Sequence, residues 1–216
     1  MSRPVKTPRR YDASGRQELA RQTRRDVLAA AKELFLERGY AATTMADVAA
    51  QAGVAVQTVY SAVGGKAAVL KEVFDVTLVG DDEPVPMSGR PEIARVSAET
   101  DGRRKLELFA AYVSGVMERL SPLAPVLQAS ADADADAARL WEGYAQGRHQ
   151  GMTEFATNLK SQGLLRRGMT VDRAAAILAT HIDVTNWRNL VERHGFTKRQ
   201  WERWLVDVTE AAILRT

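Results

Sequence analysis

The chain contains no cysteine and only three histidines among its 216 residues. Without cysteine it has no disulfide bonds, no thiolate zinc sites and no cysteine nucleophiles. The motifs of nucleotide-binding proteins and hydrolases, and the zinc motif HExxH, are also missing, so we expect neither an enzyme nor a bound cofactor or metal. No apolar run reaches the length of a membrane span and no signal peptide is visible, which favours a cytoplasmic protein with no membrane partner.

Strand-like alternation is lacking as well, and apolar residues recur instead at helical spacing. In the first such segment, Val27, Ala31, Leu34 and Phe35 fall on one helical face. With 45% apolar and 26% charged residues, the composition is that of a globular protein. The sequence predicts an all-α fold with helices over about 17–38, 45–52, 56–63, a stretch from 66, a short helix after 91, and 103–120, 124–131, 136–162, 171–193 and 198–214.

The net charge of +3 conceals an uneven distribution along the chain. The first 25 residues hold eight basic and two acidic side chains, which gives this segment +6 and leaves −3 on the rest. A basic segment next to a slightly acidic remainder indicates a polyanionic partner at one end of the molecule. A solvated tail that only aids solubility is the alternative.

Residues 43–66 have the spacing of a helix-turn-helix, which places a short helix in the major groove of DNA. Thr44 and Asp47 form a capping box before the first helix. Ala49 lets the two helices approach closely, and Gly53 takes the positive φ that the turn needs. Val59 packs the second helix against the first. An αα-hairpin of an enzyme is the alternative, but it does not require this spacing.

Residues 34–70 resemble the N-terminal domain of TetR-type transcriptional repressors. The matching phrases are apolar–x–x–x–Gly–Tyr–x–x–Thr–Thr, followed by Ala–Gly–Val–small–x–x–Thr–Val–Tyr and a lysine that opens the next helix. Prolines, a glycine and charges indicate a flexible basic arm over residues 1–16. The resemblance implies a helix-turn-helix DNA-binding domain (17–65), a connecting helix (66–80) and a helical effector-binding and dimerisation domain (81–216). The chain departs from the pattern after Tyr60, where Ser61, Ala62 and Val63 replace aromatic bulk.

The exposed face of the helix predicted over about 56–63 is expected to read the bases. Gln57 can pair with adenine, and Thr58 can contact a thymine methyl group or a phosphate. The resemblance implies phosphate contacts by Thr44, Tyr60 and Lys66, although Tyr60 could instead be a core residue. The arm could either follow the minor groove of the DNA or be attracted loosely to its backbone. The expected DNA-binding residues are Arg9, Arg10, Thr44, Ala55, Val56, Gln57, Thr58, Tyr60 and Lys66.

Glycines recur every four residues in the segment 136–162, at Gly143, Gly147 and Gly151. Each costs about 1 kcal/mol of helix propensity relative to alanine, so the stripe needs a reason, either close packing of another helix or space for a ligand. Aromatic and apolar residues nearby are expected to line a ligand cavity. The expected ligand-binding residues are Phe109, Tyr112, Val113, Met117, Trp141, Tyr144, Arg148, His149, Met152, Phe155 and His181.

These features together predict a homodimeric transcriptional regulator. By the resemblance it is a repressor, released from a palindromic double-stranded operator by a small apolar or aromatic effector. The alternatives are a ligand-independent DNA-binding protein or activator, and a helical small-molecule-binding protein whose DNA-binding domain is non-functional.

Overall fold

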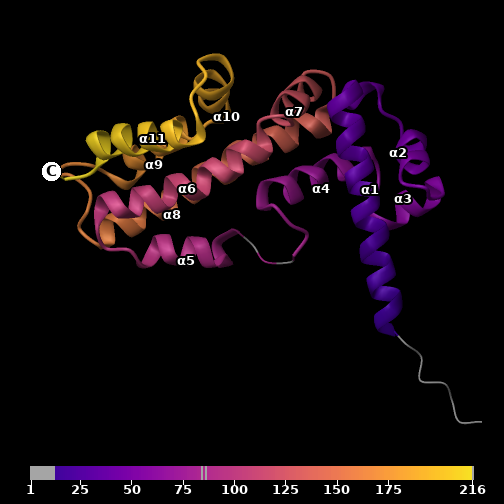
Figure 1. Ribbon diagram of the computed structural model, residues 1–216, viewed down its shortest axis with the longest axis horizontal. Helices are drawn as coiled ribbons and strands as arrows, with labels where there is room; N and C mark the ends of the chain where they lie inside the picture. The colour runs from indigo at the N-terminus through magenta and orange to yellow at the C-terminus, as the bar shows by residue number, and fades with distance from the viewer. Residues whose placement is uncertain (1–12, 84, 86, 216) are drawn as a thin grey trace, which may run out of the picture.

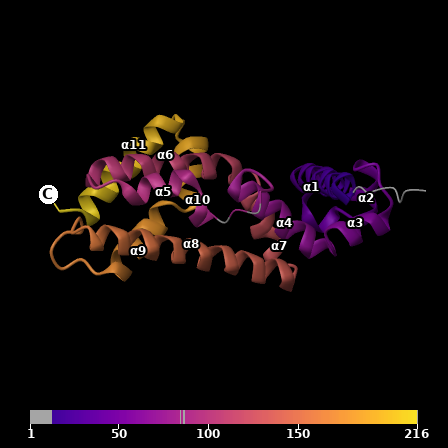
Figure 2. The same cartoon turned by 90° about the horizontal axis from the view of Figure 1, so that it is seen from below.

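The computed structural model describes residues 13–83, 85 and 87–215, and Figures 1 and 2 show an elongated helical molecule. A small head occupies one end, and α4 leads from it into a larger body. The described residues contain no strand, so the predicted all-α fold is confirmed. The head consists of α1 (Ala13–Ala42), α2 (Met45–Gln51) and α3 (Val56–Ala62). Next come α4 (Lys66–Val79), η1 (Met87–Gly89), α5 (Pro91–Ala98), α6 (Gly102–Leu120), α7 (Ala124–Ala131), α8 (Ala135–Ser161), α9 (Val171–His181), α10 (Val184–Trp187), the π-helical turn η2 (Arg188–Arg193) and α11 (Lys198–Ile213).

Short polar side chains begin many of these helices. Thr170 accepts a hydrogen bond from the backbone of α9, and Thr197 forms a complete capping box with Gln200 at the start of α11. Asp101 and Asp134 cap α6 and α8 in the same way. Such caps satisfy backbone N–H groups that have no partner within the first turn, which is why these boundaries could be predicted.

The prediction of one continuous helix over residues 171–193 is wrong, because α9 ends at His181 and two shorter elements, α10 and η2, follow it. Asp183 has an extended backbone, and its carboxylate accepts a hydrogen bond from the Thr185 N–H at 2.8 Å. The amide of Asn186 donates to the Thr180 carbonyl at 2.6 Å and so bonds to the end of α9. These side chains compete with the helical hydrogen bonds and start α10 in a new direction.

Two apolar cores lie along the molecule. The head core contains Phe35, Val59 and Leu70, and it also includes Leu123 and Leu127 from the α7 region of the body. The body core is formed mainly by α6, α8, α9 and α11. Leu123 and Leu127 therefore join the head to the body by shared burial rather than by chain connection alone.

Lys105 is a fully buried charged residue in the body. Its ammonium donates to the Ser97 carbonyl at 3.1 Å and to the side-chain oxygen of Asn158. Burial lowers the pKa of Lys105. These hydrogen bonds link α5, α6 and α8 at one point. A long apolar side chain could fill the same space, but it would not select the Ser97 carbonyl and the Asn158 amide as neighbours.

Arg119 of α6 holds the end of α4. Its guanidinium donates to the Thr77 and Leu78 carbonyls, each at 3.0 Å. Gly80 ends α4 with a φ of 99°, and a Cβ there would lie 3.2 Å from the guanidinium carbon. Last-turn carbonyls lack helical partners, so this side chain acts as a C-terminal cap supplied by the body.

We expect Arg119→Met to lower the free energy of unfolding by about 1–3 kcal/mol, because the carbonyls of α4 lose their donors in a half-buried place. Urea unfolding followed by circular dichroism measures the change. Arg104→Met is the matched control, since the exposed Arg104 forms an ion pair with Glu107 of its own helix and such pairs contribute little. Equal effects of the two substitutions would contradict the capping role.

Candidate DNA-binding site

The start of α2 is held by the capping box that the sequence predicts. The Asp47 N–H donates to the Thr44 hydroxyl oxygen at 3.1 Å, and the Thr44 N–H donates to the Asp47 carboxylate at 2.8 Å. The Thr44 hydroxyl also donates to that carboxylate. These bonds lower the pKa of the Asp47 carboxyl.

The turn between α2 and α3 is compact and depends on Gly53. This residue has a φ of 68°, and the Val54 N–H reaches back to the Ala49 carbonyl at 3.0 Å. Ala49 is 2% exposed and Val59 is completely buried. The small residue, the glycine and the valine thus have the positions that the spacing predicts for a helix-turn-helix.

The outward face of α3 carries the residues expected to read DNA. Ala55 is the N-terminal flanking residue of the helix and is exposed, as are Val56 and Gln57, whereas Thr58 is half-buried. Tyr60 is 48% exposed, so it is not a core residue of this chain. A short helix therefore presents an open polar and aromatic face, while Val59 holds its other face in the core.

The expected phosphate-binding residues lie around this helix. Thr44 is exposed at the start of α2. Lys66, at the start of α4, donates to the Ala41 carbonyl at 3.2 Å and lies 4.3 Å from the centre of the Tyr40 ring. Its desolvation there lowers the pKa of its ammonium. Lys66 thus joins α4 to the end of α1, while Arg9 and Arg10 lie outside the described residues.

Five of the expected ligand-binding residues meet in the body core. The rings of Phe109 and Phe155 stack with their centres 4.4 Å apart. Tyr112 packs against the same core and is half-buried. The five core residues are Phe109, Val113, Met117, Met152 and Phe155.

Trp141 and Tyr144 lie apart from that group, near the head. Both pack against the head core. The Tyr144 hydroxyl donates to the Asp75 carboxylate at 2.9 Å, and its ring lies 5.2 Å from that of Phe74. Burial raises the pKa of Tyr144. The structure therefore places Tyr144 in a contact between α8 and α4, which the sequence could not show because the partners are 69 residues apart.

The polar members of the expected ligand set do not meet in one cavity. Arg148 forms an ion pair with Asp183 at 2.9 Å. His149 is exposed on α8. His181 contacts its own helix through the Ile177 carbonyl at 2.7 Å and lies 5.9 Å from the Trp204 ring.

The glycine stripe of α8 faces open space within the described chain. A Cβ added at Gly143, Gly147 or Gly151 would meet no neighbouring atom within 4 Å. No helix of the described chain packs closely onto these glycines, so close packing within one chain does not explain the stripe.

Comparison with known proteins agrees with this geometry. Residues 27–73 match the family of bacterial regulatory proteins named tetR. The whole fold is similar to that of NalD, the secondary repressor of the MexAB-OprM multidrug efflux pump in Pseudomonas aeruginosa, with 20% identity and a TM-score of 0.68 over 92% of this chain and 98% of that chain.

Two other solved structures with this fold contain small molecules. One is a complex of SmeT with triclosan, which has 22% identity and a TM-score of 0.65 over 89% of this chain and 92% of that chain. The other is a transcriptional regulator from Saccharomonospora viridis in complex with choline, which has 17% identity and a TM-score of 0.64 over 91% of this chain and 100% of that chain. No curated protein matches the chain.

We expect Asp47→Asn to destabilise the head at neutral pH and to have a smaller effect in acid. The folded state lowers the pKa of Asp47, so its contribution is present above the ordinary value of 3.8 and is lost as pH falls through the folded pKa. Thermal unfolding of both proteins between pH 3 and pH 7 tests this. A difference between them that stays constant over this range would contradict the assignment.

Proposed function

We propose that this chain, whose residues 27–73 match the tetR family of bacterial regulatory proteins, is a sequence-specific transcriptional repressor that a small molecule releases from its operator. The observation that carries the proposal is the outward face of α3, where Gln57 and Tyr60 are exposed while Val59 of the same helix is buried. A helix held in this way can enter the major groove without distorting the head.

In this proposal α3 supplies base contacts and its surroundings supply phosphate contacts. Gln57 pairs with an adenine edge, and Thr58 contacts a neighbouring base or phosphate, with Ala55 and Val56 close to the groove floor. Phosphate contacts come from Thr44, Tyr60 and Lys66 and from the arm that contains Arg9 and Arg10. Phosphate contacts set the register of the head on DNA, whereas base contacts set the sequence that is preferred.

The active form in this proposal is a homodimer on a palindrome. A single short recognition helix contacts too few base pairs for specificity in a genome, and two heads related by a two-fold axis double the site. The last helices of the body are suited to the contact between subunits. Leu190, Val191 and Trp204 are half-buried there, at the edge of the body core.

The effector in this proposal is small and apolar or aromatic, and it binds in the body. The stacked rings of Phe109 and Phe155 and the Met152 side chain belong to the body core and would supply apolar and aromatic contacts to such a ligand. SmeT holds triclosan, an aromatic compound, within the same fold. A ligand that favours one spacing of the two heads lowers DNA affinity by its differential affinity for the two states, and α4 carries the change.

Selection of bound sequences from random duplex DNA at fixed salt tests the DNA-binding part of the proposal. We expect a palindromic consensus with half-sites about one helical turn apart or more. Weak binding without a consensus that fades steeply with salt would leave only electrostatic attraction and would overturn it. A compound that binds the body but leaves affinity for the consensus unchanged would count against release by that effector.

Gln57→Ala should weaken binding to the consensus by about ten- to hundredfold and relax the preference at one position of each half-site, because one bidentate base contact is lost. Affinity for non-specific duplex should change little. Fluorescence anisotropy with each single-base variant of the consensus measures both quantities. Gln150→Ala, an exposed glutamine on α8 that bonds Glu154, is the control and should leave binding intact. An unchanged preference in Gln57→Ala would assign base reading elsewhere.

A further inference from the structure

The first turns of α1 extend well beyond the packed part of the head. The helix starts at Ala13, but its first fully buried residue is Val27. At about 1.5 Å per residue, the intervening segment projects by roughly 20 Å, and Figure 1 shows it below the rest of the head. A helical segment without a packed face is marginal in water, so its ordered projection needs support.

Ion pairs with the α4 region support the base of this projection. Arg24 pairs with Glu72 of α4, and Arg25 pairs with Asp82 just beyond it at 3.4 Å. These contacts fix the direction in which the projecting segment leaves the head.

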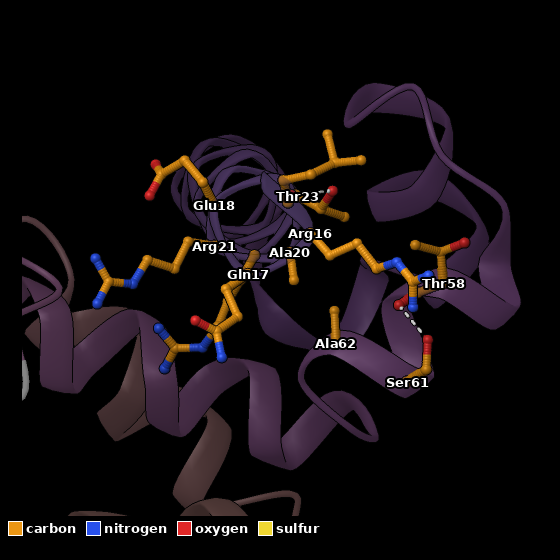
Figure 3. Close-up of a pocket in the computed structure, with 11 residues that line it drawn as sticks. Arg16, Gln17, Glu18, Ala20, Arg21, Thr23, Thr58, Ser61 and Ala62 are labelled. Atoms are coloured by element: carbon orange, nitrogen blue, oxygen red, sulfur yellow. Dashed lines mark hydrogen bonds between the residues drawn. The ribbon is translucent and has the colours of Figure 1, made fainter. Parts of the chain in front are cut away.

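An open hollow of about 1080 Å³ lies between this segment and α3. Arg16, Ala20 and Thr23 lie on the side of α1 that faces α3, and the far wall is formed by Thr58, Ser61 and Ala62 (Figure 3). Alanine, serine and threonine are short, which leaves the space open. Ser61 and Ala62 of this wall are two of the positions where the sequence lacks the aromatic bulk expected after Tyr60.

The polar groups of the hollow are suited to an anion. Figure 3 shows the Arg16 side chain extending across the hollow toward Thr58, while Glu18 points to the opposite side of α1. The Glu18 carboxylate is bonded to Arg25 at 2.9 Å. A guanidinium carries five N–H donors and no acceptor, so Arg16 can bind phosphate and retain a contact within the head.

We propose that this hollow holds a phosphate group of the DNA backbone, with Arg16 as its main ligand. The proposal rests on DNA binding by α3 and adds a second element, the start of α1, on the other side of the same strand. With α3 in the major groove, the strand that borders the groove passes beside the helix. The hollow lies beside α3 at Thr58, so α1 and α3 contact that strand from two sides.

The salt dependence of binding to the selected consensus tests this proposal. For Arg16→Gln, we expect the slope of log K against log salt concentration to become shallower by about 0.9 for each head bound, with affinity lowered alike on consensus and non-specific duplex. Arg16→Lys keeps the charge and should retain most of the slope. Arg173→Gln, an exposed arginine on α9 with the same change in charge, should leave the slope unchanged.

Ethylation interference locates the contact. In the unmodified chain, ethylation of one phosphate at the flank of each half-site should block binding, and this interference should be absent in Arg16→Gln. An unchanged slope together with a lower unfolding temperature would show that Arg16 only packs α1 onto α3 and would overturn the proposal. A loss of affinity confined to one base position would overturn it as well, because it indicates base reading. Failure of the unmodified chain to select any consensus would instead refute DNA reading by α3, a separate result.

Discussion

Burial of α4 in the head core is the constraint on which the rest of the structure depends. Val69, Leu70, Val73 and Phe74 of α4 are buried in the same core as residues of α1 and α2, so this connecting helix helps to form the head core. Its other end is held by Arg119 of the body through backbone carbonyls. Because one rigid helix is anchored in both parts, a shift of α6 relative to the head must move or strain α4.

The remaining contacts between head and body reinforce this arrangement. Leu123 and Leu127 complete the head core from the body side, and Tyr144 bonds Asp75 midway along α4. Figure 2 shows α4 and α7 between the head and the rest of the body. A ligand bound among α6 and α8 would therefore act on helices that contact α4 directly, so no further element is needed to couple it to the head.

Much of the head could be predicted because its signals are local. Thr44 with Asp47, Gly53 and Val59 act over a few residues, and each has the role that its spacing indicates. The break at Asp183 was missed although a capping signal was present, since the apolar periodicity on both sides masked it. The arrangement of Tyr144, His149 and His181 depends on packing between distant helices, and helical spacing alone does not determine which neighbour each side chain meets.

The open glycine stripe has a mechanical consequence for α8. The helix begins at the head core, where Ala137 is buried, and ends in the body core, where Met152, Phe155 and Leu159 are buried. Tyr144, bonded to Asp75 of α4, extends the first of these anchors, and beyond it Gly147 and Gly151 together reduce helix propensity by about 2 kcal/mol relative to alanine. The section of α8 between these anchors is therefore where this helix, the longest of the body, bends at the lowest free-energy cost.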